Sequence, residues 1–262
     1  MRLVPGSLFA LLFSGAIVAS CTTFGGAEGD ADAATGDGGR ATPMVEIAGA
    51  FRIDATEVSN ASYDLFLGDV IGNKVDASVI AHSQCSFNSS YARGPGCAGA
   101  TGANMPVTCI DWCDAWAYCA WAGKRLCGKI GAKELLASER TDVTKSQWTL
   151  ACAGPSSARV PYEGAARASA CVTSDAVPSP TGPQPVGETA TCQGKTAGLF
   201  DMVGNVSEWE DNCETVGKPY DHKCTPRGGA HVDSSAAALC QFSSDAIRKD
   251  ARPTLGFRCC SL

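Results

Sequence analysis

Fifteen cysteines are distributed along this chain of 262 residues, and they constrain its fold more than any other feature. No Cys-x-x-Cys motif has histidine partners and the chain holds only three histidines, so a zinc site is not expected. In an oxidising compartment, a large even set of cysteines predicts a framework of disulfides. Dense cysteines, many turns and few long periodic segments together indicate a mixed α+β domain with much irregular structure.

The N-terminus predicts export. Arg2 precedes an apolar run from Leu8 to Val18 that is too short to cross a bilayer. The run ends in Val-Ala-Ser-Cys21, a pattern typical of a bacterial lipobox. We expect residues 1–20 to be a lipoprotein signal peptide and Cys21 to be lipidated, since several acyl chains anchor a protein far better than one. The alternative is an ordinary signal peptide, with Cys21 as one more thiol. Without Cys21, 14 cysteines remain, an even number.

The mature chain is expected in the cell envelope. Thr22 stands where an aspartate would favour retention in the inner membrane, so we expect an outer-membrane lipoprotein facing the periplasm or the surface. Residues 21–43 are rich in Ala, Gly and Asp and predict a flexible tether. Residues 44–262 suit one domain with one core. The net charge of −6 and the lack of a basic stripe make nucleic acid an unexpected partner.

Local patterns predict a few short elements. Apolar stretches from Met44 to Asp54 predict two strands, or one bent strand. Ser59 is a candidate N-cap for a short helix that Gly68 would end. Asp111 is a good cap for a second helix, which Gly123 would end.

Two stretches have the composition of loops. Residues 69–105 show no clear hydrophobic periodicity, and Cys85 and Cys97 are expected to anchor this long loop through disulfides. Residues 154–197 are rich in Pro, Gly and Ser. We therefore expect the domain to contain more loop than regular structure.

The stretch from Gly198 to Trp209 is the most informative for function. It reads Gly-Leu-Phe-Asp-Met-Val-Gly-Asn-Val-Ser-Glu-Trp, with carboxylates at Asp201 and Glu208. Two carboxylates with a glycine between them suit a tight loop around a hard cation. On spacing alone, a polar turn that leads into a strand is the simpler interpretation.

The same stretch resembles the signature of the formylglycine-generating enzyme family, also called sulfatase-modifying factors. The resemblance runs from about Met44 to the C-terminus and implies a single-domain, C-type-lectin-like fold of low secondary-structure content. Four further blocks match in the family's order: Phe51–Asn60, Pro106–Leu126, Arg227–Gly229 and Gly256–Cys259.

The resemblance implies a structural calcium ion. By position, its ligands would be the side chains of Asp201 and Glu208 and the main-chain carbonyls of Gly204 and Val206. A second calcium site of the family, expected between about residues 170 and 187, has no clear Asn/Asp pattern here and is not expected.

The resemblance also implies two disulfides. By position these are Cys119–Cys259 and Cys152–Cys240. Each closes a long loop and should stabilise the fold by about 3–5 kcal/mol in the chain-entropy model. Cys260 needs a different partner, which the sequence does not identify.

The copper site of the family is changed. Members that make formylglycine oxidise a sulfatase cysteine with O₂, and they hold copper(I) through two cysteines that follow Arg-Gly-Gly-Ser. Here Asp233 and Ala238 stand at or next to those positions. A carboxylate and a methyl group do not replace two thiolates for a soft ion, so copper is not expected. Cys240, the nearest cysteine, would have to act alone.

Three functions follow as hypotheses. The favoured one is a lipid-anchored extracytoplasmic family domain without the copper oxidase, which binds a peptide, protein or glycan as an accessory module. The alternative is an active formylglycine-generating or related oxidoreductase that acts on a cysteine-containing protein. The third is a purely structural envelope protein. His82, His222 and His231 lack the spacing of an iron-binding triad, and a His231–Asp233 base is the weaker interpretation of that pair.

Overall fold

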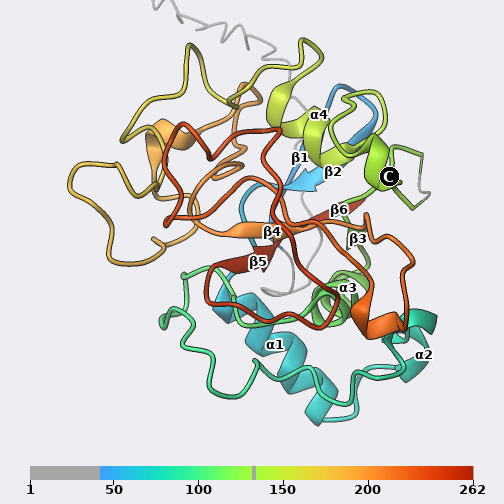
Figure 1. The fold of residues 1–262 in the computed structure, drawn as a ribbon. Coiled ribbons are helices and arrows are strands. Elements are labelled where there is room, and N and C mark those ends of the chain that lie inside the picture. Colours follow the sequence, from blue (N-terminus) through green and yellow to red (C-terminus); the bar gives the residue numbers. More distant parts are fainter. Residues whose placement is uncertain (1–41, 132–133, 262) are drawn as a thin grey trace, which may run out of the picture. The chain divides into compact units, whose positions relative to one another are not determined.

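A small sheet joins the two ends of the domain. The computed structural model describes residues 42–131 and 134–261, which fall in the compact unit Asp37–Leu262. The predicted strands near Met44 form an antiparallel hairpin, and the last strand of the chain pairs beside it (Figure 1). The sheet has the order β1-β2-β6-β3, with β1 Met44–Ile47, β2 Phe51–Asp54, β6 Cys259–Ser261 and β3 Arg125–Leu126.

A second sheet holds the end of the informative stretch. Its two strands, β4 Ser207–Trp209 and β5 Leu255–Phe257, are parallel. Glu208 therefore lies directly opposite Gly256, one residue before the end of β5. This pairing brings two blocks of the family signature side by side, although almost fifty residues separate them in the chain.

The first helix is longer than predicted. Ser59 is its N-cap and accepts a hydrogen bond from the main-chain N–H of Ser62. The helix, α1 Asn60–Ile71, continues through Gly68 and ends at Gly72, whose N–H donates to the Gly68 carbonyl. The predicted end at Gly68 was wrong because that glycine keeps the right-handed conformation, and glycine then only lowers helix propensity.

The central helix follows its prediction. α3 Trp112–Trp121 begins with a reciprocal capping box between Asp111 and Asp114, and Gly123 follows its end with a positive φ of 69°. Aromatic rings of α1 and α3 pack against β5 in one core, with centroids 5.3–5.8 Å apart in the pairs Tyr63–Phe66, Tyr63–Tyr118 and Tyr118–Phe257.

A second core lies around Trp148 of α4 Gln147–Ala153. The remaining elements are short: α2 Ala77–Ile80, and the 3-10 turns η1 Ser83–Cys85, η2 Ala137–Glu139, η3 Ala190–Cys192 and η4 Pro219–Asp221. Between residues 154 and 197 only η3 is regular, as the loop prediction required.

Disulfides supply much of the cross-linking. All 14 cysteines of the described ranges are paired, and both pairs that the resemblance implied, Cys119–Cys259 and Cys152–Cys240, are present. The missing partner of Cys260 is Cys127. The remaining pairs are Cys85–Cys113, Cys97–Cys109, Cys171–Cys192 and Cys213–Cys224, so Cys85 and Cys97 anchor the long loop at two points.

The predicted signal peptide, Cys21 and nearly all of the tether lie outside the described residues. Among the residues that the structure describes, no helix combines the length and the apolar character that crossing a membrane requires.

Candidate functional site

The four predicted calcium positions lie in one buried segment, which runs from a tight turn into β4. Asp201 and Gly204 both have positive φ angles, 56° and 76°, so the chain turns tightly between the two carboxylates. A side chain at Gly204 would stand 2.5 Å from the Val172 carbonyl oxygen, so only glycine fits there. Val206 and Glu208 are also buried, at 1% exposure each.

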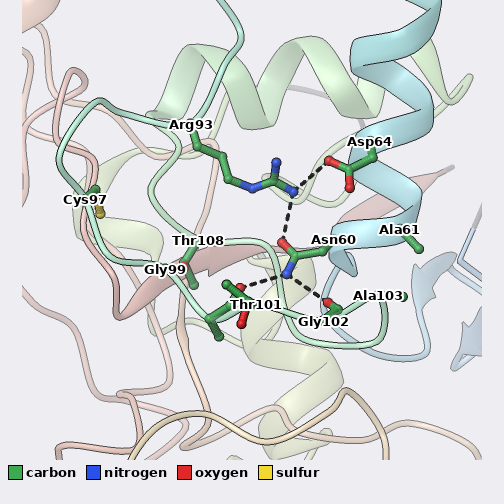
Figure 2. Close-up of a pocket in the computed structure, with 11 residues that line it drawn as sticks. Asn60, Ala61, Asp64, Arg93, Cys97, Gly99, Thr101, Gly102, Ala103 and Thr108 are labelled. Atoms are coloured by element: carbon green, nitrogen blue, oxygen red, sulfur yellow. Dashed lines mark hydrogen bonds and ion pairs between the residues drawn. The ribbon is translucent and has the colours of Figure 1, made fainter.

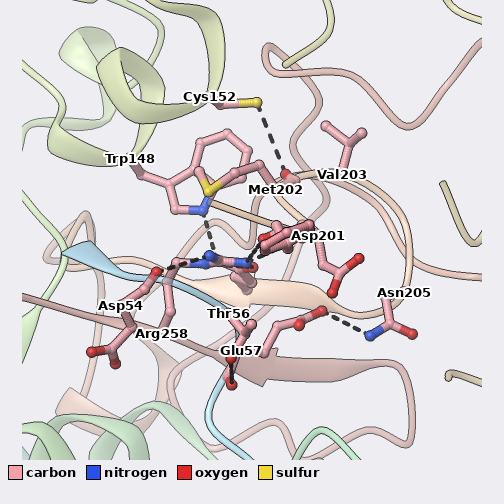
Figure 3. Close-up of polar contacts among 12 residues, drawn as sticks. Asp54, Thr56, Glu57, Trp148, Cys152, Asp201, Met202, Val203, Asn205 and Arg258 are labelled. Atoms are coloured by element: carbon pink, nitrogen blue, oxygen red, sulfur yellow. Dashed lines mark hydrogen bonds and ion pairs between the residues drawn. The ribbon is translucent and has the colours of Figure 1, made fainter. Parts of the chain in front are cut away.

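The Glu208 carboxylate is held by the protein itself. Arg258 donates to it through Nε, at 2.9 and 2.8 Å, and through Nη2, at 2.7 Å. The indole Nε1 of Trp148 donates to the same carboxylate at 2.7 Å. Figure 3 shows the Arg258 guanidinium at the centre of these contacts, where it also donates to the main-chain oxygens of Asp54, Phe200 and Asp201.

Two other acids of this buried cluster are only half-satisfied. Asp201 accepts a hydrogen bond from Gly187 N–H through Oδ2, while its buried Oδ1 has no partner. Glu57 accepts one from Asn205 through Oε1, while its buried Oε2 has none (Figure 3). Burial raises the pKa of Asp201 to about 6 and that of Glu57 well above its usual range, with the neighbouring Asp201 charge adding to the second shift.

The arrangement fits a cation in part. The orphaned Oδ1 of Asp201 is a free oxygen of the kind that calcium takes, whereas both oxygens of Glu208 are occupied by donors. Across the described ranges, no group of three or more His, Cys, Asp or Glu side chains is placed to hold a metal ion. The predicted set relies on two carboxylates and two carbonyls, so calcium binding stays a prediction.

The two positions that replace the copper cysteines meet at Gly229. A Cβ atom on Gly229 would lie 3.2 Å from Ala238 Cβ and 3.3 Å from Asp233 Oδ2. Asp233 is used locally, since its Oδ2 accepts a hydrogen bond from the Ala230 N–H at 2.8 Å. The nearest cysteine, Cys240, is fully buried in its disulfide with Cys152. Sequence positions that the resemblance paired are therefore neighbours in space, but neither offers a sulfur.

An open recess of about 630 Å³ lies beside the start of α1 (Figure 2). Its loop wall is tied to the helix by Asn60, whose Nδ2 donates to the carbonyls of Ala100 and Gly102 at 2.8 and 3.0 Å. Arg93 closes the same side, donating to Asn60 Oδ1 and pairing with Asp64. Sequence reasoning did not find this recess, because much of its lining comes from an irregular loop with no recognisable pattern.

Comparison with known proteins decides the family. Residues 20–261 match the family described as "Sulfatase-modifying factor enzyme 1-like domain". The chain belongs to the sulfatase-modifying factor family. It is 26% identical to a formylglycine-generating enzyme of Mus musculus and 25% identical to one of Bos taurus, in each case over 80% of this chain and 65% of the relative, just under two thirds.

Solved structures share the fold of this sulfatase-modifying factor domain. PvdO from Pseudomonas aeruginosa superposes with a TM-score of 0.55 at 21% identity, over 80% of this chain and 79% of PvdO. CarF gives 0.52 at 21% identity, over 80% of this chain and 85% of CarF. Few helices, small sheets and seven disulfides identify the α+β, C-type-lectin-like variant of low secondary-structure content that the sequence predicted.

The arginine of the Arg-Gly-Gly block, Arg227, is a structural anchor in this family domain. Arg227 is fully buried and pairs with Glu210 at 3.0 Å. It also donates to the main-chain oxygens of Arg140, Cys240 and Phe242. Arg227 thus pairs with a buried acid and with main-chain carbonyls, as Arg258 does.

The His231–Asp233 pair does not form. His231 Nδ1 lies 3.1 Å from the Asn205 carbonyl oxygen, and the Asp233 carboxylate accepts a hydrogen bond from the Ala230 N–H. By contrast, His82 and His222, which are far apart in the chain, line one cavity. Sequence spacing gave no sign of that juxtaposition, nor of the buried Glu57 beside Asp201.

Calcium should stabilise the EDTA-treated protein. At about 100 times its Kd, a ligand that binds only the folded state adds about 2.7 kcal/mol, which for a domain of this size raises Tm by roughly 5–10 °C. Because the pKa of Asp201 is raised to about 6, its carboxyl is largely protonated at pH 5, so the shift should be larger at pH 8. Differential scanning calorimetry with and without CaCl₂ measures it.

Asp201→Asn should remove most of this calcium effect, and Asp64→Asn, at an exposed acid that pairs with Arg93, should leave it intact. Equal calcium shifts in the wild type and Asp201→Asn would contradict the predicted ligand.

Proposed function

We propose that this chain is a lipid-anchored, extracytoplasmic member of the sulfatase-modifying factor family that works as a binding or accessory module without the copper oxidase. The proposal rests on one observation: the described residues offer no free cysteine thiol where the family binds copper. Every cysteine in residues 42–131 and 134–261 is in a disulfide. By the resemblance, Asp233 stands at the first copper position of the family and Ala238 at or next to the second, and both lie beside Gly229.

The chemistry of the donor set argues against copper(I). Soft copper(I) selects thiolates, and a sulfur in a disulfide is neither charged nor a comparable ligand. Cys240 could act alone only if its bond to Cys152 were reduced. The residues at this position therefore do not fit the copper centre of the family.

The disulfide count supports an extracytoplasmic location. Seven disulfides in one domain are typical of proteins in oxidising compartments and rare in the reducing cytosol. They also use all 14 cysteines after Cys21, which leaves Cys21 free for the lipid that the lipobox predicts. Export and anchoring thus account for the full set of 15.

The recess beside α1 is the proposed binding surface. Its volume of about 630 Å³ lies in the range of roughly 300–1,000 Å³ that ligand sites occupy. Carbonyls of the 97–103 loop, Asn60 and the Arg93–Asp64 pair offer polar groups of both signs. Such a lining suits a peptide segment or a glycan.

Restoring the two sulfurs tests the loss of copper binding. Copper(I) titrated into the wild type should show no stoichiometric thiolate binding, while Asp233→Cys/Ala238→Cys should gain it because both positions adjoin Gly229. Asp233→Ser/Ala238→Ser is the matched control. Tight thiolate binding by the wild type would overturn the proposal.

The alternative function, an active oxidoreductase, draws on the similarity to formylglycine-generating enzymes. It predicts an aldehyde on a peptide containing Cys-x-Pro-x-Arg, detectable by mass spectrometry. The accessory-module proposal predicts an unmodified peptide. Aldehyde that forms with the wild type and disappears in Cys240→Ala would favour the enzyme.

A further inference from the structure

A small cavity beside the first turn of α3 is separate from the recess of Figure 2 and from the calcium loop, with which it shares no lining residue. We call it the histidine cavity. It has a volume of about 210 Å³, and its lining is mostly polar. The residues that matter here are His82, Trp112, Asp211, Thr215, His222 and Arg248.

Two disulfides fix the walls of the histidine cavity. Cys85–Cys113 ties the turn after His82 to α3, next to Trp112. Cys213–Cys224 closes the loop that carries Thr215 and His222. The turns η1 and η4 also contact each other, so the cavity is enclosed by cross-linked segments and is preformed.

Arg248 is a buried cation without an ion pair in the described residues, although the charges of Asp211, Glu134 and Asp111 act on it from beyond 4 Å. It is 2% exposed, and its guanidinium lies 4.6 Å from the centre of the Trp112 ring. Nη1 donates to the Gln84 carbonyl at 3.2 Å, and the buried Nε has no partner. Within the described ranges no carboxylate oxygen lies within 4 Å of it. Buried charges are normally paired, so this guanidinium calls for an anion.

Asp211 lies in the same lining and is an acid without an ion pair in the described residues, although the charges of Arg125 and Arg248 act on it from beyond 4 Å. Its main chain is fixed, with N–H donating to the Cys127 carbonyl at 2.7 Å, but its carboxylate accepts no hydrogen bond from the described residues. Glu134, an exposed residue of the lining, adds a second acid. Burial lowers the pKa of both His82 and His222, so the histidines add no further cation at neutral pH.

We propose that the histidine cavity binds a small zwitterion, such as a free α-amino acid, whose carboxylate pairs with Arg248 and whose ammonium pairs with Asp211. Arg248 and Asp211 share one cavity but form no ion pair with each other, and a zwitterion completes both. A simple anion would leave Asp211 unpaired, and a metal cation would face the guanidinium. The cavity is smaller than the sites of drug-sized ligands, which suits a molecule of a few heavy atoms.

Calorimetry with the full chain at pH 7 tests the proposal, using glycine and L-serine as zwitterions and acetate and ethylamine as probes with one charge. The zwitterions should bind saturably. Each single-charge probe should bind at least about tenfold more weakly, because one charge-assisted contact is lost. No saturable binding of either zwitterion, or acetate binding as tightly as glycine, would overturn the proposal; the first result would mean a cavity that holds water only.

Variants locate the binding. Arg248→Gln should weaken glycine binding at least about tenfold, whereas Arg252→Gln, at a partly exposed arginine outside the lining, should not. If Arg248→Gln fails to fold, Thr215→Trp fills the mouth of the cavity from an exposed position and should abolish binding. Glycine binding that survives Thr215→Trp unchanged would overturn the assignment. The outcome is independent of the copper titration, since the two sites share no residue.

Discussion

Replacing Arg258 by methionine should lower the free energy of unfolding by about 3–5 kcal/mol, because removing one partner of a buried ion pair leaves an uncompensated charge. Arg258 is fully buried and satisfies Glu208 through three contacts, with Glu57 and Asp201 close enough for their charges to act on it. Without the guanidinium, three buried acids would face each other. Urea denaturation followed by tryptophan fluorescence measures the loss.

The matched control is Arg252→Met. Arg252 pairs with Asp250 where both side chains are partly exposed, so its removal should cost less than about 1 kcal/mol. A second comparison is Glu208→Leu/Arg258→Met, which removes both charges and should recover part of the single-variant loss. If Arg258→Met and Arg252→Met lowered the free energy of unfolding by equally small amounts, the buried contacts of Arg258 would not stabilise the fold.

Removing both disulfides that join α3 and β3 to the last strand should cost about 7 kcal/mol, more than twice the loss for either alone. Cys119–Cys259 and Cys127–Cys260 connect the same two segments. When one of these disulfides is removed, the other still closes the long loop. The unfolded chain then gains only the freedom of a ring of about ten residues, which lowers the free energy of unfolding by about 3 kcal/mol in the chain-entropy model. Removing the second frees the whole loop, which the Cys152–Cys240 bond shortens to about fifty residues, at about 4 kcal/mol.

A double-mutant cycle with paired Cys→Ala variants checks this coupling by urea denaturation. Cys97→Ala/Cys109→Ala is the control, since that bond closes a separate loop of 12 residues, and its loss should add simply to the loss of Cys119–Cys259. Additive losses for the two neighbouring disulfides would mean that they do not act on one loop.

Local features of this fold were accessible from the sequence. Ser59 and Asp111 cap helices because their side chains accept main-chain N–H groups within the first turn, and that chemistry depends only on near neighbours. Gly68 failed as a stop signal for the complementary reason: it keeps the right-handed conformation, and the chain turns left-handed only after the C-cap Gly72, at Asn73, whose φ is 52°.

Long-range features depended on the family resemblance or were missed. The Cys119–Cys259 pair came from the resemblance alone, and Cys127 was not identified as the partner of Cys260 because β3 pairs with β6 across 133 residues. The sequence predicted which residues could bind calcium, but it did not predict that Arg258 contacts Glu208. That contact depends on how β4 and β5 align. The juxtaposition of Arg248 and Asp211 had no sequence signal.

Counting free thiols tests the central claim, that this sulfatase-modifying factor domain has no thiolate pair for copper(I). The full chain, purified without reductant, would be denatured in the presence of an alkylating reagent and mapped by mass spectrometry. The account predicts no alkylated cysteine between residues 42 and 262, with the seven disulfide-linked peptide pairs intact. Two alkylated cysteines, above all Cys152 and Cys240, would contradict it.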